Sequence, residues 1–154
     1  MKTRILAVSA LTLALAALAP PALAKDGKKA GTAVLLPAGD IQWTDVPDVP
    51  GAQMATLDGD PTKGAGHFLI KLKDGFVAPL HHHTSDHFAT VLSGTMSFTV
   101  DGKETLLPAG SFFVFKGKKE HITKCMPGAD CVLSVDVRGK WDVVPEKAES
   151  AAKK

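Results

Sequence analysis

The sequence has little net charge, no apolar run long enough to cross a bilayer and no internal repeat. Its 18 basic and 16 acidic residues give a formal charge of +2 without a basic stripe, so the charge pattern does not favour nucleic-acid binding. The longest apolar stretch is shorter than the ~20 residues of a membrane span, which excludes a multi-span membrane protein. With 45% hydrophobic and 22% charged residues, the 154-residue chain is typical of a single globular domain.

The first 24 residues have the features of a secretory signal peptide. Lys2 and Arg4 form a positive start, an apolar stretch runs from Ile5 to Ala19, and a small-residue cleavage site ends at Ala24. The alternative is an uncleaved N-terminal anchor, although the apolar stretch is short for one. Cleavage would leave 130 residues with 16 basic and 16 acidic side chains. We therefore expect a periplasmic or secreted protein without stable membrane insertion, beginning with a flexible tail over residues 25–31.

The two cysteines lie six positions apart in the part of the chain that remains after cleavage. Between Cys125 and Cys131 the sequence contains Pro127-Gly128, which favours a tight turn. In an exported protein an even number of cysteines suggests a disulfide, and a hairpin at this turn would bring the two sulfurs together. Two free thiols are the alternative.

Short strands separated by turn signals fill the chain between the tails. Residues 95–100 alternate apolar and polar side chains, Asp101-Gly102 is a strong hairpin signal, and residues 103–107 return. Further strands are predicted at 67–73, 88–92, 111–115, 120–124 and 132–137. Because few segments have a helical apolar period, the pattern predicts an all-β fold, an antiparallel sandwich or barrel.

Several apolar side chains lead to expectations about burial. The run 111–115 reads as a strand covered on both faces, and Met96, Phe112, Phe113 and Phe115 are expected in the core. Phe88 and Leu92 should point to the face opposite His87. That outer face is expected to be covered by a second sheet or by another subunit.

Four of the six histidines crowd into seven positions, at 81, 82, 83 and 87. On a strand, His81 and His83 share a face and His82 points away, so His82 is expected to lie outside any site formed by the other two. If His87 returns to the shared face, three imidazoles converge. Neutral imidazole is the commonest protein ligand for transition metals, so this cluster predicts a metal site.

A fourth ligand should come from a neighbouring strand, and His67 and His121 are the two candidates. The chain between His87 and His121 contains two hairpin signals, which would bring His121 back beside the cluster. We therefore favour His81, His83, His87 and His121 as metal ligands, and expect His67 to be a pocket wall or a solvated strand residue. A surface histidine patch that binds metal adventitiously is the alternative.

The histidine spacing resembles the two motifs of the cupin family. Gly75 is followed after five residues by His81-His82-His83, after three more by His87, and after six more by Gly94. In the second motif, Gly110 is followed after five residues by Lys116-Gly117-Lys118, then by His121 after two more and Cys125 after a further three. Here His87 replaces the usual glutamate, Lys-x-Lys replaces Pro-x-Gly, and Cys125 replaces the asparagine.

The resemblance implies an RmlC-like cupin domain over residues 32–145, with a C-terminal tail at 146–154. Its fold would be a jelly-roll β-barrel (double-stranded β-helix) with the metal inside, often as a homodimer. The ion could be Fe, Mn, Cu, Zn or Ni.

Four neutral imidazoles leave the charge of a divalent ion uncompensated, so the ion would acidify a bound water and attract an anionic ligand. No general acid or base is evident, because Asp86 and Glu120 face away by strand parity. We expect a metal-dependent, oxygenase-like enzyme for a small organic molecule, or a binding or sensing protein without turnover. A barrel with a vestigial site is a third reading.

Overall fold

The computed structural model describes residues 32–146. The predicted signal peptide, the tail at 25–31 and the C-terminal residues 147–154 lie outside the described residues. The chain divides into two units, 1–35 and 36–154, and the fold described here is that of the second. Among the described residues there is no helix that is long and apolar enough to cross a membrane.

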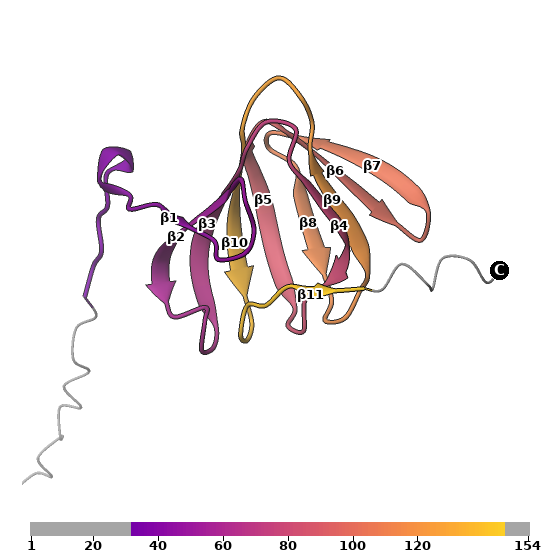
Figure 1. Cartoon of the computed structure of the whole chain (residues 1–154). Helices are drawn as coiled ribbons and strands as arrows, with labels where there is room; N and C mark the ends of the chain where they lie inside the picture. Colours follow the sequence, from indigo (N-terminus) through magenta and orange to yellow (C-terminus); the bar gives the residue numbers. More distant parts are fainter. Residues whose placement is uncertain (1–31, 147–154) are drawn as a thin grey trace, which may run out of the picture. The chain divides into compact units, whose positions relative to one another are not determined.

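Two antiparallel sheets form this unit (Figure 1). The six-stranded sheet has the order β1 (Thr44–Asp45), β2 (Ala52–Gly59), β3 (Gly66–Leu72), β10 (Cys131–Val137), β5 (His87–Ser93), β8 (Phe112–Phe115). The five-stranded sheet has the order β11 (Val144–Pro145), β4 (Val77–His82), β9 (His121–Cys125), β6 (Thr95–Val100), β7 (Lys103–Pro108). A single 3₁₀ turn, η1 (Ala38–Asp40), precedes β1 among the described residues.

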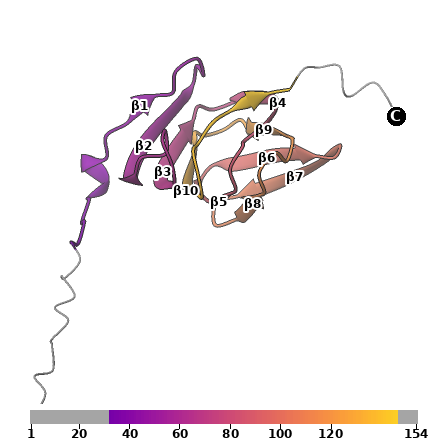
Figure 2. The same cartoon turned by 90° about the horizontal axis from the view of Figure 1, so that it is seen from below.

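Side chains from both sheets form the core between them, as expected for sheets with one apolar face each. Phe68, Val91 and Val135 come from the six-stranded sheet, and Met96 and Phe98 come from the five-stranded sheet. The chain crosses between the sheets repeatedly, so neighbours within a sheet are mostly distant in sequence (Figure 2). The predicted all-β fold of antiparallel barrel type is confirmed.

The Asp101-Gly102 turn joins β6 to β7 as the sequence predicts. Both residues have positive φ, 51° and 77°. This is the combination of a type I′ hairpin turn, whose twist matches that of the flanking strands. The register pairs Val100 with Lys103, directly across the turn.

Cys125 and Cys131 form a disulfide with an S–S distance of 2.12 Å, but the expected hairpin between them is wrong. Cys125 ends β9 in the five-stranded sheet and Cys131 begins β10 in the six-stranded sheet. The segment between them therefore crosses from one sheet to the other, and the disulfide links the two sheets. Gly94 lies against it with φ +73°, and a Cβ there would be 2.7 Å from the Cys131 sulfur.

The outer face of the six-stranded sheet is less covered than the sequence predicts. Strand β8 is at the sheet edge, and Phe112 is 60% exposed, so the expectations of a strand covered on both faces and of a core Phe112 are wrong. Leu92 is also half exposed. In place of a second sheet, Phe88 meets the charged groups of Lys116 and Arg138, 5.4 and 5.0 Å from its ring. A continuous apolar run thus indicates apolar residues on both faces, without indicating what covers them.

Candidate metal centre

The four histidines of the predicted site lie on both sheets and face the space between them. His81 in β4 is paired in register with His121 at the start of β9. His83 directly follows β4. His87 begins β5 in the other sheet, where it pairs with Phe115 of β8. All four side chains are buried, between 1% and 6% exposed.

Three of these histidines form a tight group. His81, His83 and His121 each offer one ring nitrogen, and the three nitrogens lie within 4.8 Å of one another. The ring centres of His81 and His121 are 4.4 Å apart. His87 is adjacent but further out: its ring centre is 4.7 Å from that of His83 and 6.4 Å from that of His121.

Backbone carbonyl groups hold the rings of the three grouped histidines. His81 Nδ1 donates to the Pro79 carbonyl at 2.7 Å, and His121 Nδ1 donates to the Lys119 carbonyl at 2.9 Å. His83 Nδ1 donates to the carbonyl of Asp142. Because the proton must be on Nδ1 in each case, Nε2 carries a free lone pair. This pattern is typical of metal-binding histidines, where the second nitrogen fixes the tautomer and the orientation.

His87 differs from the other three in its hydrogen bonding. Its Nδ1 is buried and makes no hydrogen bond of ordinary geometry. An unpaired buried nitrogen is costly unless something else satisfies it. The ring is instead packed against the rings of Phe115 and Trp141.

Burial keeps the four histidines neutral. Removal from water lowers the pKa of His87 and His121 to about 4 and that of His83 to about 3, and it also lowers the pKa of His81. Mutual repulsion between the rings, should they become charged, acts in the same direction. Only neutral imidazole can bind a metal, so this environment favours metal binding over protonation.

Two aromatic rings pack on the histidines from either side. Trp141 stacks on His83, with ring centres 4.1 Å apart and planes at 23°, and meets His87 edge-on. Phe115 stacks on His121 at 4.0 Å and 10°. Sequence reasoning missed Trp141, because it lies 20 residues beyond His121 and no spacing motif includes it.

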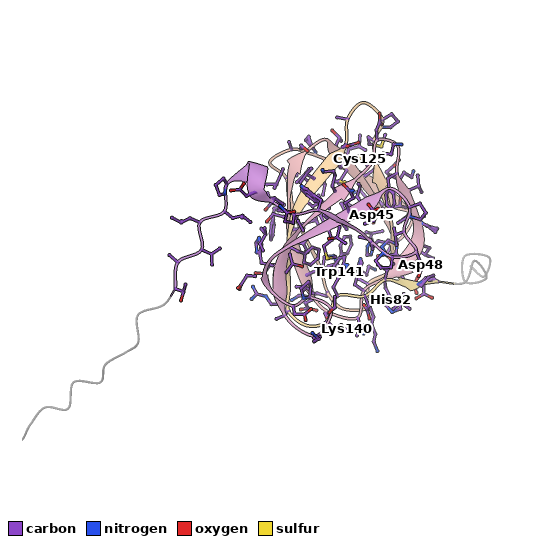
Figure 3. The ribbon with its side chains drawn as sticks, turned by 60° about the vertical axis from the view of Figure 1, so that its left-hand side comes forward. Asp45, Asp48, His82, Cys125, Lys140 and Trp141 are labelled. Atoms are coloured by element: carbon purple, nitrogen blue, oxygen red, sulfur yellow. A yellow bond between two sulfur atoms is a disulfide. The ribbon has the colours of Figure 1, made fainter. Side chains whose placement is uncertain are left out.

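The segment that carries Trp141 is tied to the loop after His83. The Asp142 carboxylate accepts hydrogen bonds from the Thr84 backbone N–H at 2.7 Å and from the Thr84 hydroxyl at 2.6 Å. The Ser85 hydroxyl donates to the Lys140 carbonyl at 2.9 Å. Figure 3 shows Trp141 inside the barrel, with Lys140 at its rim and Cys125 at the opposite end. Asp142 therefore positions both His83 and the tryptophan.

The loop before His121 departs from the cupin motif at a position where the backbone has positive φ. Lys118 replaces the motif glycine and has φ 64°, a region in which a side chain is disfavoured. Its N–H donates to the His83 carbonyl at 2.8 Å, so the strained turn helps to hold the histidine loop.

The four histidines form part of the wall of a cavity between the sheets. Its empty space is about 660 Å³, including the solvent at its mouth. Thr123 and Trp141 also line it, and the remaining lining residues are aliphatic or phenylalanine. No carboxylate, lysine or arginine is among the described residues that line it. Among the described lining residues, the four histidines are therefore the titratable side chains.

The other residues singled out in the sequence lie outside this cavity. His82 points away from it and pairs with Glu146, Nδ1 to Oε1 2.5 Å. His67 hydrogen-bonds to Ser134 and its side chain is 40% exposed, as expected for a solvated strand residue. Lys116 of the second motif pairs with Asp86 at 2.7 Å.

The histidine cluster fits a divalent transition metal. All its donors are imidazole nitrogens, which suit zinc, copper, iron and nickel. Three of the rings are anchored with Nε2 free, and the fourth has a buried nitrogen without a partner.

Residues 68–137 match the Cupin domain family. This match supports a cupin domain in that part of the chain, and the two-sheet antiparallel barrel is consistent with the cupin fold. The polyketide cyclase RemF from Streptomyces resistomycificus is similar in structure, with a TM-score of 0.66 and 16% identity over 77% of this chain and 89% of that one. An RmlC-like cupin protein from Ralstonia eutropha has a TM-score of 0.61 and 21% identity over 75% and 74% of the two chains. Identities this low indicate a shared fold only.

A curated relative shares more sequence over a similar part of the chain. The DNA damage-repair/toleration protein DRT102 of Arabidopsis thaliana is 28% identical over an alignment of 123 positions that covers 73% of this chain. The matched part covers 35% of the plant protein. The chain thus spans about a third of that relative.

Proposed function

We propose that this protein is an exported cupin that holds a divalent transition metal on His81, His83, His87 and His121 and binds a small organic molecule at it, with oxygenase-like turnover as its activity. The observation that carries the proposal is the group of three buried histidines, each anchored through Nδ1 with Nε2 free. The cavity beside the group supplies space for the organic molecule.

The chain's own residues hold the histidine rings in place, orient them and cover them. The carbonyl groups of Pro79, Lys119 and Asp142 fix the rings, and Trp141 and Phe115 cover two of their faces. A metal bound there would supply Lewis acidity and the activation of water or oxygen. The apolar wall disfavours water in the rest of the cavity, and a lower content of water would strengthen electrostatic interactions inside it.

A second candidate function is binding or sensing without turnover. It is favoured by the absence of any carboxylate or lysine among the described lining residues, since many enzymes need such a group for proton transfer. The two functions share the metal site and differ only in whether the bound molecule is changed.

Export is supported by the sequence of residues 1–24 and by the disulfide, since disulfides persist mainly in oxidising compartments. Intact-mass measurement of protein purified from its native compartment tests this directly. A mature chain that begins at Lys25 is expected, and a chain that retains residues 1–24 would contradict it.

The metal proposal is tested by elemental analysis of the same material, followed by oxygen uptake with diketones, phenolics and thiols. One equivalent of a transition metal is expected, with oxygen consumption on at least one substrate class. His121→Ala should lose the metal, whereas His67→Ala, on a solvated strand face, should keep it. Metal without turnover would favour the binding function, and retention of metal by the His121→Ala variant would overturn the site.

A further inference from the structure

The cavity next to the histidines has a wall without ionised side chains. Ile70, Leu133 and Val135 line it from the six-stranded sheet, and Phe98 lines it from the five-stranded sheet. Thr123 supplies a hydroxyl, two residues after His121 on the inward side of β9. Among the described lining residues there is no aspartate, glutamate, lysine or arginine.

Because no described lining residue is ionised, a bound metal ion would carry the charge of the site. Four neutral imidazoles leave a divalent ion with its full charge, in an environment where an uncompensated charge is unfavourable. One anionic group on the ligand would compensate it. A second ionised group on the ligand would find no counter-ion on the wall, and a set of hydroxyls would find only Thr123 and the indole of Trp141 as partners.

Building on the proposed metal centre, we infer that the ligand is a small organic anion with a single metal-binding head, a carboxylate or an enolate, and an uncharged apolar body. The head would neutralise the ion and the body would bury apolar surface against the wall. Dicarboxylates, amino acids and polyhydroxylated acids are selected against because of their additional polar groups.

Val143 offers a way to change this selectivity. It lines the cavity and is also 43% exposed, so a charged replacement could reach both the cavity and solvent. Val77 offers a matched control. It begins β4, the strand that neighbours β11, and Val143 directly precedes β11. Val77 is 56% exposed and is not a lining residue of the cavity.

The test uses the mature protein loaded with Co²⁺, whose visible absorption reports directly on what binds the ion. Hexanoate, adipate, acetate and 1-hexanol are titrated by calorimetry and by absorption. Hexanoate should bind about 100-fold more tightly than acetate, because it buries four more methylene groups. It should also bind about 100-fold more tightly than adipate, whose second carboxylate would be buried unpaired. 1-Hexanol should leave the cobalt spectrum unchanged.

Val143→Lys should narrow the preference for hexanoate over adipate at least about tenfold, because it supplies a counter-ion at the wall. Val77→Lys carries the same charge outside the cavity and should leave the preference as it is. The comparison of ligands on the unaltered protein stands by itself, whatever the folding of the Val143→Lys variant.

Three results would overturn the inference while leaving the metal centre intact. Adipate could bind as tightly as hexanoate, hexanoate could fail to bind the cobalt-loaded protein, or hexanoate could bind equally well without cobalt. A protein that takes up no cobalt would overturn the metal centre itself, and that result is obtained before any ligand is added.

Discussion

The two ends of strand β9 connect the sheets in different ways. At one end Cys125 is joined covalently to Cys131 of the six-stranded sheet. At the other end His121 lies with His81 and His83, close to His87 of the six-stranded sheet, and only a shared ligand would join them. Figure 3 shows Cys125 at one end of the barrel and Lys140, the neighbour of Trp141 in sequence, at the other.

The connection at the disulfide end of β9 is permanent, whereas the connection at the histidine end depends on conditions. The disulfide constrains the chain whatever the pH or the metal supply, as long as the compartment is oxidising. The histidine end places four polar rings in an apolar cavity, which contributes to stability only while they remain neutral or hold an ion. We therefore expect the two ends of β9 to respond independently to mutation, pH and metal.

The largest effect is expected from His121→Ala. Loss of a hydrogen-bond partner outside the metal's own ligands typically costs ten- to a hundredfold in affinity, so loss of a ligand should cost at least ~100-fold. Metal titration by calorimetry measures this. The disulfide should still form, as shown by thiol counting, and a thiol count above zero would mean that the two ends are coupled.

Lowering the pH should reduce the free energy of unfolding of the metal-free protein through its buried histidines. The unfolded chain has histidine pKa values of ~6.5, whereas burial lowers those of His87 and His121 to about 4 and that of His83 to about 3. Between these limits the unfolded state binds more protons, so the free energy of unfolding falls as pH falls from ~6.5 toward about 4. Urea unfolding across this range measures the decline.

Bound metal provides the control for the acid experiment. Protons must displace the ion before the rings can be charged, so the decline should move to lower pH in the metal-loaded protein. Identical profiles with and without metal would contradict the placement of the ion on these rings.

Removing the disulfide should cost about 2 kcal/mol of unfolding free energy, because the closed loop is short. Cys125→Ala combined with Cys131→Ala, compared with the unaltered protein by urea unfolding, measures this. Metal stoichiometry should be unchanged, since the histidines are at the other end of the strand. A variant that also loses its metal would break the distinction between the two ends.

Lys118→Gly should raise the free energy of unfolding of the protein by about 1 kcal/mol. Glycine adopts the positive φ of 64° without the clash of a side chain. The N–H that donates to the His83 carbonyl is retained. Thermal unfolding measures the gain. Lys103→Gly, in an ordinary exposed strand position, should destabilise instead, and a gain in both variants would contradict the explanation.

The smallest change in unfolding free energy is expected from a substitution on the outer face of the six-stranded sheet. Phe112→Ser removes an apolar side chain that is 60% exposed, so the unfolding free energy should change by no more than ~0.5 kcal/mol. A homodimer of the kind implied by the cupin resemblance could cover this residue. A larger loss that depends on protein concentration would show that another copy covers it.

Local patterns predicted most of the longer strands, although not β2, and much of the histidine cluster. Alternation predicted β6, and the type I′ signal predicted the turn to β7, because both depend only on neighbouring residues. The spacing of His81, His83 and His121 predicted residues that the structure brings within 4.8 Å. The placement of His87 as a fourth ligand stays a prediction.

Contacts across long stretches of sequence were not predictable in the same way. A turn signal at Pro127-Gly128 shows that the chain reverses, but it does not show which sheet the next strand joins, so the expected hairpin was wrong. Trp141 reaches His83 because Asp142 is tied to Thr84, 58 residues earlier. No local pattern encodes such a pairing.

The short length of β9 limits how this protein can be altered. His121, Thr123 and Cys125 occupy alternate positions, and all three are buried while the residues between them are not. Inserting one residue between His121 and Thr123 would turn either the His121 imidazole or the disulfide sulfur of Cys125 outward, because side chains alternate along a strand. Such an insertion would thus disrupt either the proposed metal site or the disulfide.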